Sequence, residues 1–267
     1  MSVVFDRAAV RVAVDGRPEP KTLLEPVSLS LTEHRIGVIG ANGSGKSTLL
    51  RMVNGLVPPS SGTVTVHGAD TVRGVRAVRR RVGFVFTDPL AQLVMPTGRE
   101  DVELSLRRLV RNPRERRAQA EAVLDRFGLL PLADQSVYEL SGGERQLVAL
   151  AAVLAVDPDI LVLDEPSTLL DLRNRELLRR TLAGLDQQII LSTHDLDLAL
   201  DLDRVLVVDA GRIVFDGVPA AAVGHYRALC AADPAPAPPA AGDSAAGGAV
   251  AGQSVAGDSV FGESARP

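Results

Sequence analysis

A glycine-rich segment carries the most specific chemical pattern of the chain. Its members are Gly40, Ala41, Asn42, Gly43, Ser44, Gly45, Lys46, Ser47 and Thr48. Glycines allow successive backbone N–H groups to turn inward around phosphate oxygens, and a helix that begins near Lys46 directs its positive dipole end at the same anion. The spacing is that of a phosphate-binding loop, so it predicts a site for the phosphates of a nucleotide.

Three side chains of this loop have separate expected roles. Lys46 should reach the β and γ phosphates, Ser47 should place its hydroxyl on Mg²⁺, and Thr48 should support the same turn. The alternative is a tight turn without a ligand. An apolar strand at residues 35–39 precedes the loop and a helix at residues 46–56 follows it, ending at Pro58-Pro59. Because phosphate binding requires this order, the sequence favours a nucleotide site.

Two adjacent carboxylates follow another apolar strand, at residues 160–163. Ligands of parallel α/β sheets sit at the carboxyl ends of the strands, so we expect Asp164 and Glu165 beside the phosphate loop. Asp164 is expected to hold Mg²⁺ through water. Glu165 faces another direction in an extended chain and is expected to polarise the attacking water. Without the loop, such a pair is as often an exposed strand end.

A second glycine-rich helix start lies farther along the chain, at Ser141, Gly142, Gly143 and Glu144, before an apolar helix that runs to about residue 155. Ser141 can cap this helix, and the two glycines expose N–H groups at its positive end. The pattern therefore predicts an anion site without a lysine of its own. An ordinary glycine-rich cap is the alternative. His194, in Ser-Thr-His-Asp, would by itself be read as a loop histidine.

Taken together and in this order, these motifs and Leu170-Asp171 resemble the ATP-binding subunits of ABC transporters over residues 1 to about 228. The resemblance implies an ATPase in which residues 141–144 of one copy contact ATP held by a second copy, across a head-to-tail dimer. It implies that His194 contacts the γ-phosphate and orients the attacking water with Glu165. It also implies that Asp171 lies in the loop that joins the two sites.

Two positions depart from this family. Most relatives carry a glutamine that reaches Mg²⁺ and reports to the membrane partner, whereas the segment after the strand at residues 82–86 has Thr87. A threonine hydroxyl is shorter by about two bonds but can still bind metal-bound water. Thr87 and Gln92 are both candidates for this role, Thr87 towards the metal and Gln92 towards coupling. Val12 lies where relatives stack an aromatic on adenine, which predicts loose base selectivity.

Residues 87–97 and 169–174 resemble the ATPase subunits of energy-coupling-factor importers for vitamins and cobalt, especially the biotin branch. This resemblance implies a homodimer, or a heterodimer with a paralogous ATPase, that powers a separate transmembrane subunit. It places the chain peripherally at the cytoplasmic face of the plasma membrane. The alternative function is a non-transport or regulatory ABC protein with weak hydrolysis.

The expected fold is α/β, with a P-loop NTPase core of the RecA type. Turn-separated apolar runs between residues 3 and 31 predict an antiparallel β layer, and Ala210-Gly211 predicts a hairpin near the end of the core. The nucleotide-binding core and the β layer are assigned to residues 1–87 and 158–230. An inserted helical subdomain with the signature motif is assigned to residues 88–157. Residues 231–267 have too little apolar surface to fold and are expected to be a disordered tail.

Composition excludes several other classes of protein. A net charge of −4 and a pI near 5.6 give no global attraction to nucleic acid, so no nucleic-acid partner is expected. The single cysteine, Cys230, cannot form an internal disulfide. The longest apolar stretch, residues 147–156, is shorter than the roughly 18 residues of a membrane span. Arginine-rich stretches at residues 73–81 and 107–117 could face anionic lipid or a partner, although solvated surface is the commoner reading.

Overall fold

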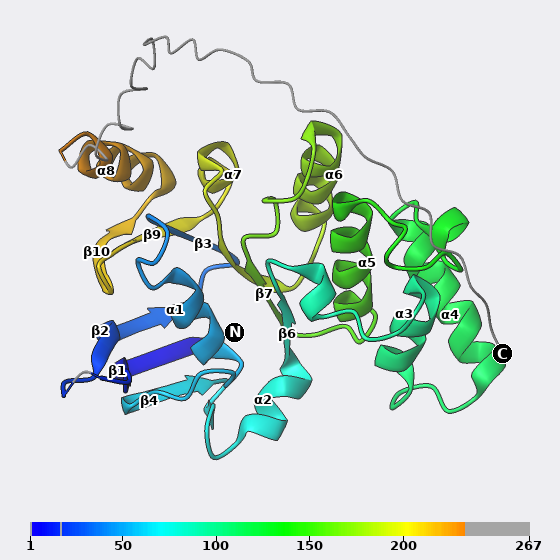
Figure 1. Cartoon of the computed structure of the whole chain (residues 1–267), viewed down its shortest axis with the longest axis horizontal. Helices are drawn as coiled ribbons and strands as arrows, with labels where there is room; N and C mark the ends of the chain where they lie inside the picture. The colour runs from blue at the N-terminus through cyan, green and yellow to red at the C-terminus, as the bar shows by residue number, and fades with distance from the viewer. Residues whose placement is uncertain (1, 17, 233–267) are drawn as a thin grey trace, which may run out of the picture. The chain divides into compact units, whose positions relative to one another are not determined.

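Two β-sheets form the framework of the protein, of which this computed structural model describes residues 2–16 and 18–232 (Figure 1). The smaller sheet is antiparallel, with the strand order β2-β1-β4-β5. Its strands are β1 (Val3–Val12), β2 (Lys21–Leu31), β4 (Ser61–Val66) and β5 (Ala69–Asp70). The expected antiparallel β layer is therefore confirmed.

The larger sheet has the strand order β10-β9-β3-β8-β7-β6. Its strands are β3 (Arg35–Ile39), β6 (Val82–Val85), β7 (Ile160–Asp164), β8 (Gln188–Ser192), β9 (Arg204–Asp209) and β10 (Arg212–Gly217). All neighbours are parallel except β9 and β10, which form the expected hairpin. Because the strands are parallel, the carboxyl ends of β3, β6, β7 and β8 meet at one edge of the sheet.

Helices cover the larger sheet and extend beyond its β6 edge. They are α1 (Lys46–Val53), α2 (Val75–Arg81), α3 (Gly98–Leu106), α4 (Pro113–Arg126), α5 (Gly142–Leu154), α6 (Leu172–Ala183), α7 (Leu196–Leu200) and α8 (Pro219–Ala232). Two short 3₁₀ turns lie at Pro89–Ala91 and Leu130–Leu132. None of the helices among the described residues has the length and apolar character needed to cross a bilayer.

Alternating side chains of the parallel strands separate two hydrophobic clusters. Ile160 and Val162 of β7 belong to the cluster that fills the space between the two sheets around α1. Leu161 and Leu163 belong to the cluster on the opposite face, with α5 and the other covering helices. A strand that is buried on both faces appears in the sequence as a continuous apolar run. Such a run predicts the strand itself but does not indicate which strands lie next to it in the sheet.

Helix ends differ in two places from those expected. α1 ends at Val53 rather than at residue 56, because Gly55 adopts a left-handed conformation with φ of 67° and closes the helix early. α8 continues to Ala232 and so includes the first two residues assigned to the tail. The rest of that assignment, residues 233–267, lies outside the described residues. The division into a core and an inserted helical subdomain stays a prediction, although Figure 1 shows α3, α4 and α5 together beside β6.

One buried carboxylate organises the segment that enters α3. Asp101 is 5% exposed, and its Oδ1 accepts hydrogen bonds from the backbone N–H groups of Val94 and Met95, at 3.0 and 3.1 Å. Burial raises the pKa of Asp101, and the two hydrogen bonds oppose that rise. This side chain therefore fixes the loop between β6 and α3 at the cost of a buried charge.

We expect Asp101→Asn to gain stability relative to the wild type as the pH rises above about 4, the ordinary range of an aspartate. With a raised pKa, the folded wild type binds more protons than the unfolded chain in this window, so its free energy of unfolding falls as the pH rises. The amide keeps the Oδ1 acceptor but has no proton to lose. Asp101→Ala should lose about 1–3 kcal/mol at neutral pH because both N–H groups lose their acceptor.

Urea unfolding of the wild type and both variants, at several pH values between acid and neutral, measures these differences. A relative stability of Asp101→Asn that falls with rising pH would contradict the raised pKa of Asp101. Asp88→Asn is a suitable control because Asp88 also accepts from a nearby backbone N–H, that of Leu90, but is exposed.

Candidate active site

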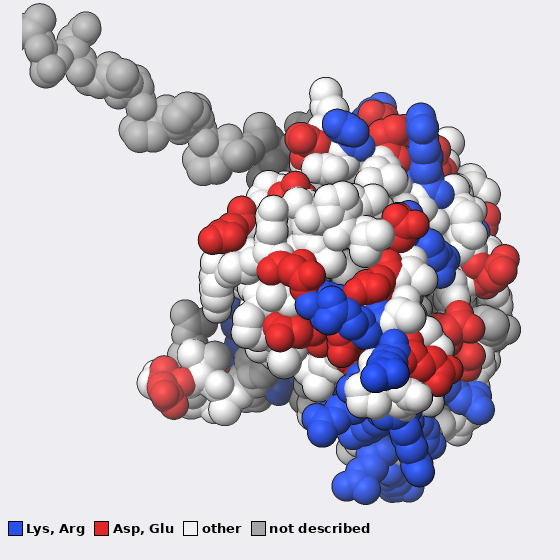
Figure 2. Space-filling view, turned by 90° about the vertical axis from the view of Figure 1, so that its right-hand side faces the viewer, with Lys and Arg blue, Asp and Glu red and all other residues white. Residues whose placement is uncertain are grey.

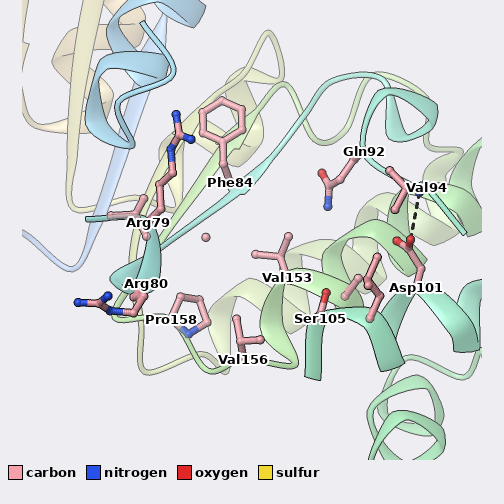
Figure 3. A pocket seen from close by; sticks show the side chains of 14 residues that line it. Arg79, Arg80, Phe84, Gln92, Val94, Asp101, Ser105, Val153, Val156 and Pro158 are labelled. Carbon is pink, nitrogen blue, oxygen red and sulfur yellow. Dashed lines mark hydrogen bonds between the residues drawn. The ribbon is translucent and has the colours of Figure 1, made fainter. Parts of the chain in front are cut away.

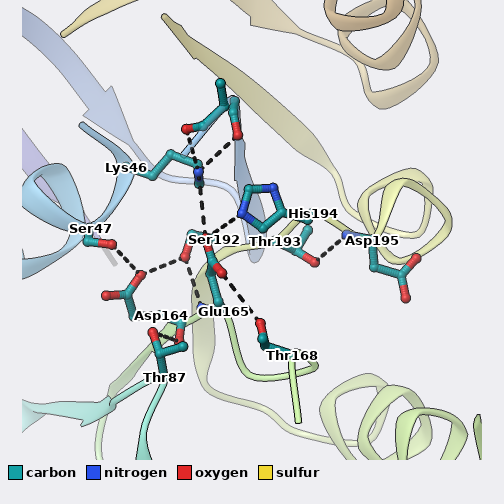
Figure 4. A network of polar contacts seen from close by, with 12 residues as sticks. Lys46, Ser47, Thr87, Asp164, Glu165, Thr168, Ser192, Thr193, His194 and Asp195 are labelled. Atoms are coloured by element: carbon teal, nitrogen blue, oxygen red, sulfur yellow. Dashed lines mark hydrogen bonds and ion pairs between the residues drawn. The ribbon is translucent and has the colours of Figure 1, made fainter. Parts of the chain in front are cut away.

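Four predicted motifs meet at the carboxyl edge of the parallel sheet (Figure 4). The phosphate loop, residues 40–48, joins β3 to α1. Asp164 is the last residue of β7, and Glu165 follows it. His194 comes two residues after β8, and Thr87 comes two residues after β6. The parallel order of these strands thus brings together residues that are far apart in the sequence.

Close backbone packing explains the glycines of the loop. A Cβ on Gly40, whose φ is 153°, would lie 2.1 Å from the carbonyl oxygen of Val208 in β9. Gly45, at φ 113°, approaches the carbonyl oxygen of Leu23 in the same way, at 2.9 Å. Both positions therefore require glycine. The β9–β10 turn supports the loop from below, since the N–H of Gly211 donates to the carbonyl of Ser44 at 2.8 Å.

Lys46 is a buried cation whose ammonium group faces the loop itself. Its Nζ donates to the carbonyl oxygens of Gly40 and Ala41, each at 2.9 Å, and its side chain is only 4% exposed. Burial lowers the pKa of Lys46, while the nearby carboxylate of Glu165, 3.6 Å from Nζ, acts in the opposite direction. A lysine held at the mouth of the loop can exchange these carbonyl contacts for contacts with an anion.

Asp164 is the centre of the polar network. Its Oδ1 accepts hydrogen bonds from the hydroxyls of Ser47 and Ser192, both at 2.8 Å, and Arg51 Nη2 lies 3.4 Å from its Oδ2. The hydroxyl of Thr87 donates to the backbone carbonyl of Asp164 at 2.9 Å. Asp164 is completely buried, so these donors replace the water that a carboxylate would otherwise bind.

Sequence reasoning did not identify Ser192 or Arg51. Arg51 lies four residues after Ser47 on α1, and residues at this spacing share one face of a helix, so this signal was available. Ser192 ends β8, the strand next to β7. Its position depends on strand order, which a single sequence does not reveal.

Glu165 lies beside His194 and Lys46, with one carboxylate oxygen shared between them. Oε1 is 2.7 Å from His194 Nε2 and 3.6 Å from Lys46 Nζ. The expectation that Glu165 diverges from Asp164 through strand alternation is wrong, because β7 ends at Asp164 and Glu165 has a left-handed backbone with φ of 51°. Its N–H donates to the carbonyl and the hydroxyl of Ser192, at 3.2 and 3.0 Å, which hold this strained conformation.

The oxygen atoms around Asp164 fit a magnesium ion. The hydroxyl of Ser47 and the carboxylate of Asp164 are 2.8 Å apart, and both are the hard donors that Mg²⁺ prefers. Among residues 2–16 and 18–232, no group of three or more His, Cys, Asp or Glu side chains could hold a metal. Mg²⁺ is usually bound by one or two protein oxygens, water and the phosphates of the substrate, and Ser47 with Asp164 can supply the protein oxygens.

The helix start at Ser141 is well formed but separate from this network. Ser141 caps α5 in a capping box, accepting from the N–H of Glu144 at 3.2 Å while the Glu144 carboxylate accepts from the N–H of Ser141 at 2.8 Å. A Cβ on Gly143 would lie 2.6 Å from Asn174 Nδ2. Among the described residues, no hydrogen bond or ion pair joins residues 141–144 to the phosphate loop.

Two further predicted residues lie on the helical side of the site. The Gln92 amide accepts from the N–H of Phe86 at 3.2 Å and donates to the carbonyl of Ala149 in α5 at 3.0 Å. Gln92 thus connects the end of β6 to α5. Of Thr87 and Gln92, the two candidates for the role of the usual glutamine, only Thr87 is hydrogen-bonded to Asp164. Asp171 caps α6 by accepting from the N–H of Asn174 at 2.8 Å.

Known proteins share this sequence and this fold. The family described as "ABC transporter" matches residues 24–168. The chain is 44% identical to the "Biotin transport ATP-binding protein BioM" of Rhizobium etli, over 86% of this chain and all of that protein. It is 38% identical to the "Energy-coupling factor transporter ATP-binding protein EcfA2" of Methanospirillum hungatei, over 76% of this chain and 53% of that protein.

Solved structures agree with the family match. A dimeric ATP-binding cassette in a post-hydrolysis state, bound to ADP and Pi, has a TM-score of 0.74 and 28% identity, covering 81% of this chain and 98% of that one. The structure of cbiO1 from Clostridium perfringens, described as part of the ABC transporter complex cbiONQ, has a TM-score of 0.71 and 28% identity. It covers 85% of this chain and 92% of that one.

These matches confirm the expected fold, a cassette of one antiparallel sheet and one mainly parallel sheet with a phosphate loop. They also explain why the loop, the buried carboxylate and the glutamate–histidine pair occur together in one chain. By sequence and by structure, this protein belongs to the ABC transporter family and is an ATP-binding ATPase of that family.

Proposed function

We propose that this chain is the ATPase subunit of an energy-coupling-factor importer for a vitamin or for cobalt, with the vitamin biotin as the first candidate and cobalt as the second. The observation that carries this proposal is the 44% identity to a protein named for biotin transport, along the whole of that protein. A second relative with the same name, from Rhodobacter capsulatus, is 38% identical over 77% of this chain. The cobalt alternative rests on the resemblance of residues 87–97 and 169–174 to the ATPase subunits of importers for vitamins and cobalt.

In this proposal, residues 40–48 bind the phosphates of ATP and Lys46 moves from its own loop carbonyls to the β and γ phosphates. Ser47 and Asp164 hold Mg²⁺, which when bound neutralises charge that develops on the phosphate oxygens. Ser192 and Arg51 keep the Asp164 carboxylate oriented through the contacts described above. The hydroxyl of Thr87 donates to the backbone carbonyl of Asp164 and accepts a hydrogen bond from a metal-bound water.

Glu165 and His194 prepare the water that attacks the γ-phosphorus. The water forms the new P–O bond, the bond to the β-phosphate oxygen breaks, and ADP and phosphate are released. Glu165 Oε1 lies 2.7 Å from His194 Nε2, so the imidazole holds this carboxylate where it can polarise a water. The strained φ of Glu165 supports the proposal because strained residues cluster at active sites.

A second copy of an ATPase completes each site. The first N–H groups of a helix have no partner within it, and the capping box of α5 occupies that of Glu144 but not those of Gly142 and Gly143. These groups and Ser141, which is exposed, can bind the γ-phosphate of ATP held by another copy. Asp171 accepts a hydrogen bond from the N–H of Asn174, and the Asn174 side chain packs against Gly143. Through these contacts, Asp171 connects the two sites.

The transmembrane partner docks, in this proposal, in a groove between α2 and β6 on one side and α3 and α5 on the other (Figure 3). The groove has a volume of about 300 Å³ and is lined mainly by apolar atoms. Gln92 lies in its wall and bonds to Phe86, the residue next to Thr87. Changes at Asp164 can therefore reach the groove through one short segment. The chain then acts at the cytoplasmic face of the plasma membrane, without a nucleic-acid partner.

We expect Glu165→Gln to lower the turnover of ATP by about 10²–10⁴-fold while ATP binding survives. The amide keeps the shape of the carboxylate but cannot polarise water, and the loop that binds the phosphates is unchanged. Steady-state phosphate release and the binding of a fluorescent ATP analogue measure the two effects. The control is Glu121→Gln, a half-buried carboxylate on α4 that is paired with Arg117. Wild-type phosphate release from Glu165→Gln would contradict the role of Glu165.

A mixing experiment tests the shared site. Lys46→Ala and Ser141→Arg should each be inactive, and an equal mixture should recover about a quarter of wild-type turnover, because half of the dimers then contain one intact site out of two. Two variants of the same phosphate loop, Lys46→Ala and Gly40→Ala, provide the control mixture, which should stay inactive. Turnover that does not recover in the first mixture would mean that Ser141 and Lys46 do not combine across copies.

The transported substrate is tested in the complete complex. The chain is purified with its membrane partners, reconstituted into vesicles loaded with ATP on the ATPase side, and supplied with radiolabelled biotin or cobalt. Biotin uptake that Glu165→Gln abolishes supports the first candidate. Uptake of cobalt without biotin would replace biotin by the second candidate.

A further inference from the structure

Two segments of the described chain carry exposed arginines that no carboxylate neutralises. Arg73 lies before α2, and Arg76 and Arg80 lie on it; Arg107, Arg108 and Arg111 lie between α3 and α4, and Arg114 lies in the first turn of α4. None of the seven forms an ion pair with another described residue, whereas their neighbours Arg81, Arg116 and Arg117 do. We call these seven residues the arginine rim.

Arg80 of the rim lines the groove, and the second segment of the rim starts two residues after Ser105, which also lines it. Arg79 and Arg80 line it from α2, Leu104 and Ser105 line it from α3, and Arg107 follows directly after α3. Figure 2, which views the molecule from the side of α3 and α4, shows Lys and Arg side chains gathered at one end of the surface. Over the rest of that face, acidic and basic side chains are mixed. The positive charge is therefore concentrated on one edge despite the net charge of −4.

Exposed apolar side chains accompany these arginines. Val72 is 50% exposed, Leu109 is 64% exposed, and Val94 in the groove wall is 71% exposed. A surface that combines basic and aliphatic side chains fits the boundary between lipid headgroups and acyl chains. Binding of single-stranded nucleic acid would instead need exposed aromatic side chains for base stacking, and the arginine rim includes none.

Nearby carboxylates do not cancel the charge of the rim. Glu103 of α3 is already engaged with Arg99 and Arg116, at 3.3 and 3.8 Å. Asp70 accepts from the backbone N–H groups of Val72 and Arg73, and these two bonds together with the charge of Arg73 lower the pKa of Asp70. Glu115 is the remaining exposed acid in this region, beside Arg114, so the rim keeps a clear excess of positive charge.

We propose that the arginine rim binds the phosphate groups of anionic phospholipids on the bilayer surface around the transmembrane partner. The orientation rests on the proposed function, because a partner seated in the groove places the rim against the membrane. Guanidinium groups form paired hydrogen bonds with phosphate oxygens and lose little hydration in doing so. Several such contacts would hold the ATPase at the membrane before and between its encounters with the partner.

Vesicle binding of the chain alone tests this proposal. The purified protein is sedimented with vesicles of phosphatidylcholine, or with vesicles that also contain phosphatidylglycerol, at low and high salt. We expect binding only to the anionic vesicles and its loss at high salt, because surface charges are then screened. Each arginine near an anionic surface contributes about fivefold, so Arg107, Arg108 and Arg111 changed together to Gln should weaken binding about 100-fold.

Two matched variants sharpen the test. The triple change of Arg73, Arg76 and Arg80 to Gln should weaken binding similarly. The triple change of Arg11, Lys21 and Arg227 to Gln removes the same charge from exposed positions outside the rim and should bind like the wild type. An equal loss in this control would mean that net charge alone drives binding and would overturn the proposal. So would equal binding to neutral vesicles, or tighter binding of the rim to an unstructured RNA than to anionic vesicles.

Failure of the proposed function gives a different result. Glu165→Gln should bind anionic vesicles like the wild type, since Glu165 lies outside the rim. Salt-sensitive vesicle binding without biotin or cobalt uptake would leave the lipid surface standing and remove the importer assignment. Uptake in the complex, with vesicle binding that does not depend on the rim, would support the importer assignment and overturn the lipid-binding proposal.

Discussion

The carboxylate of Asp164 has no contact with solvent, and the carboxyl edge of the parallel sheet is arranged around it. A buried charge of this kind is costly unless donors surround it, and here they come from two separate elements. Ser47 and Arg51 belong to α1, Ser192 ends β8, and both elements are thereby tied to the end of β7. The phosphate loop includes Ser47 and is therefore held by the same carboxylate. Its position therefore depends on satisfying the charge of Asp164.

The groups that the proposed function assigns to one catalytic half are already engaged by other protein groups. Lys46 is bonded to carbonyls of its own loop, and Glu165 is bonded to His194. An incoming triphosphate and metal would take over these partners rather than meet unpaired charges. This arrangement avoids leaving bare charges in a buried site, because polar groups without partners are expensive there. In the proposed function, the second half is the start of α5, supplied by another copy.

Much of this architecture could be predicted from the sequence because its signals are local. Buried strands such as β7 read as apolar runs, and the phosphate loop, the capping box at Ser141 and the hairpin turn at Ala210-Gly211 depend on residues that are close in the chain. Where the structure added new information, the contacts join distant segments. The bond of Ser192 to Asp164 depends on which strands are neighbours, and the bridge from Gln92 to Ala149 depends on how α5 packs. The left-handed backbone of Glu165 is maintained by Ser192, so it too was hidden from local rules.

The β9–β10 turn meets both the phosphate loop and the antiparallel sheet at Gly211. Its N–H donates to Ser44 in the loop, and its carbonyl accepts from the N–H of Glu25 in β2, both at 2.8 Å. The two backbone groups of this single glycine thus connect the phosphate loop, the β9–β10 turn and β2. A change in the conformation of the loop during a catalytic cycle would therefore displace β2, which is an edge strand of its sheet. A short chain of two hydrogen bonds thus connects the phosphate loop to the edge of the antiparallel sheet.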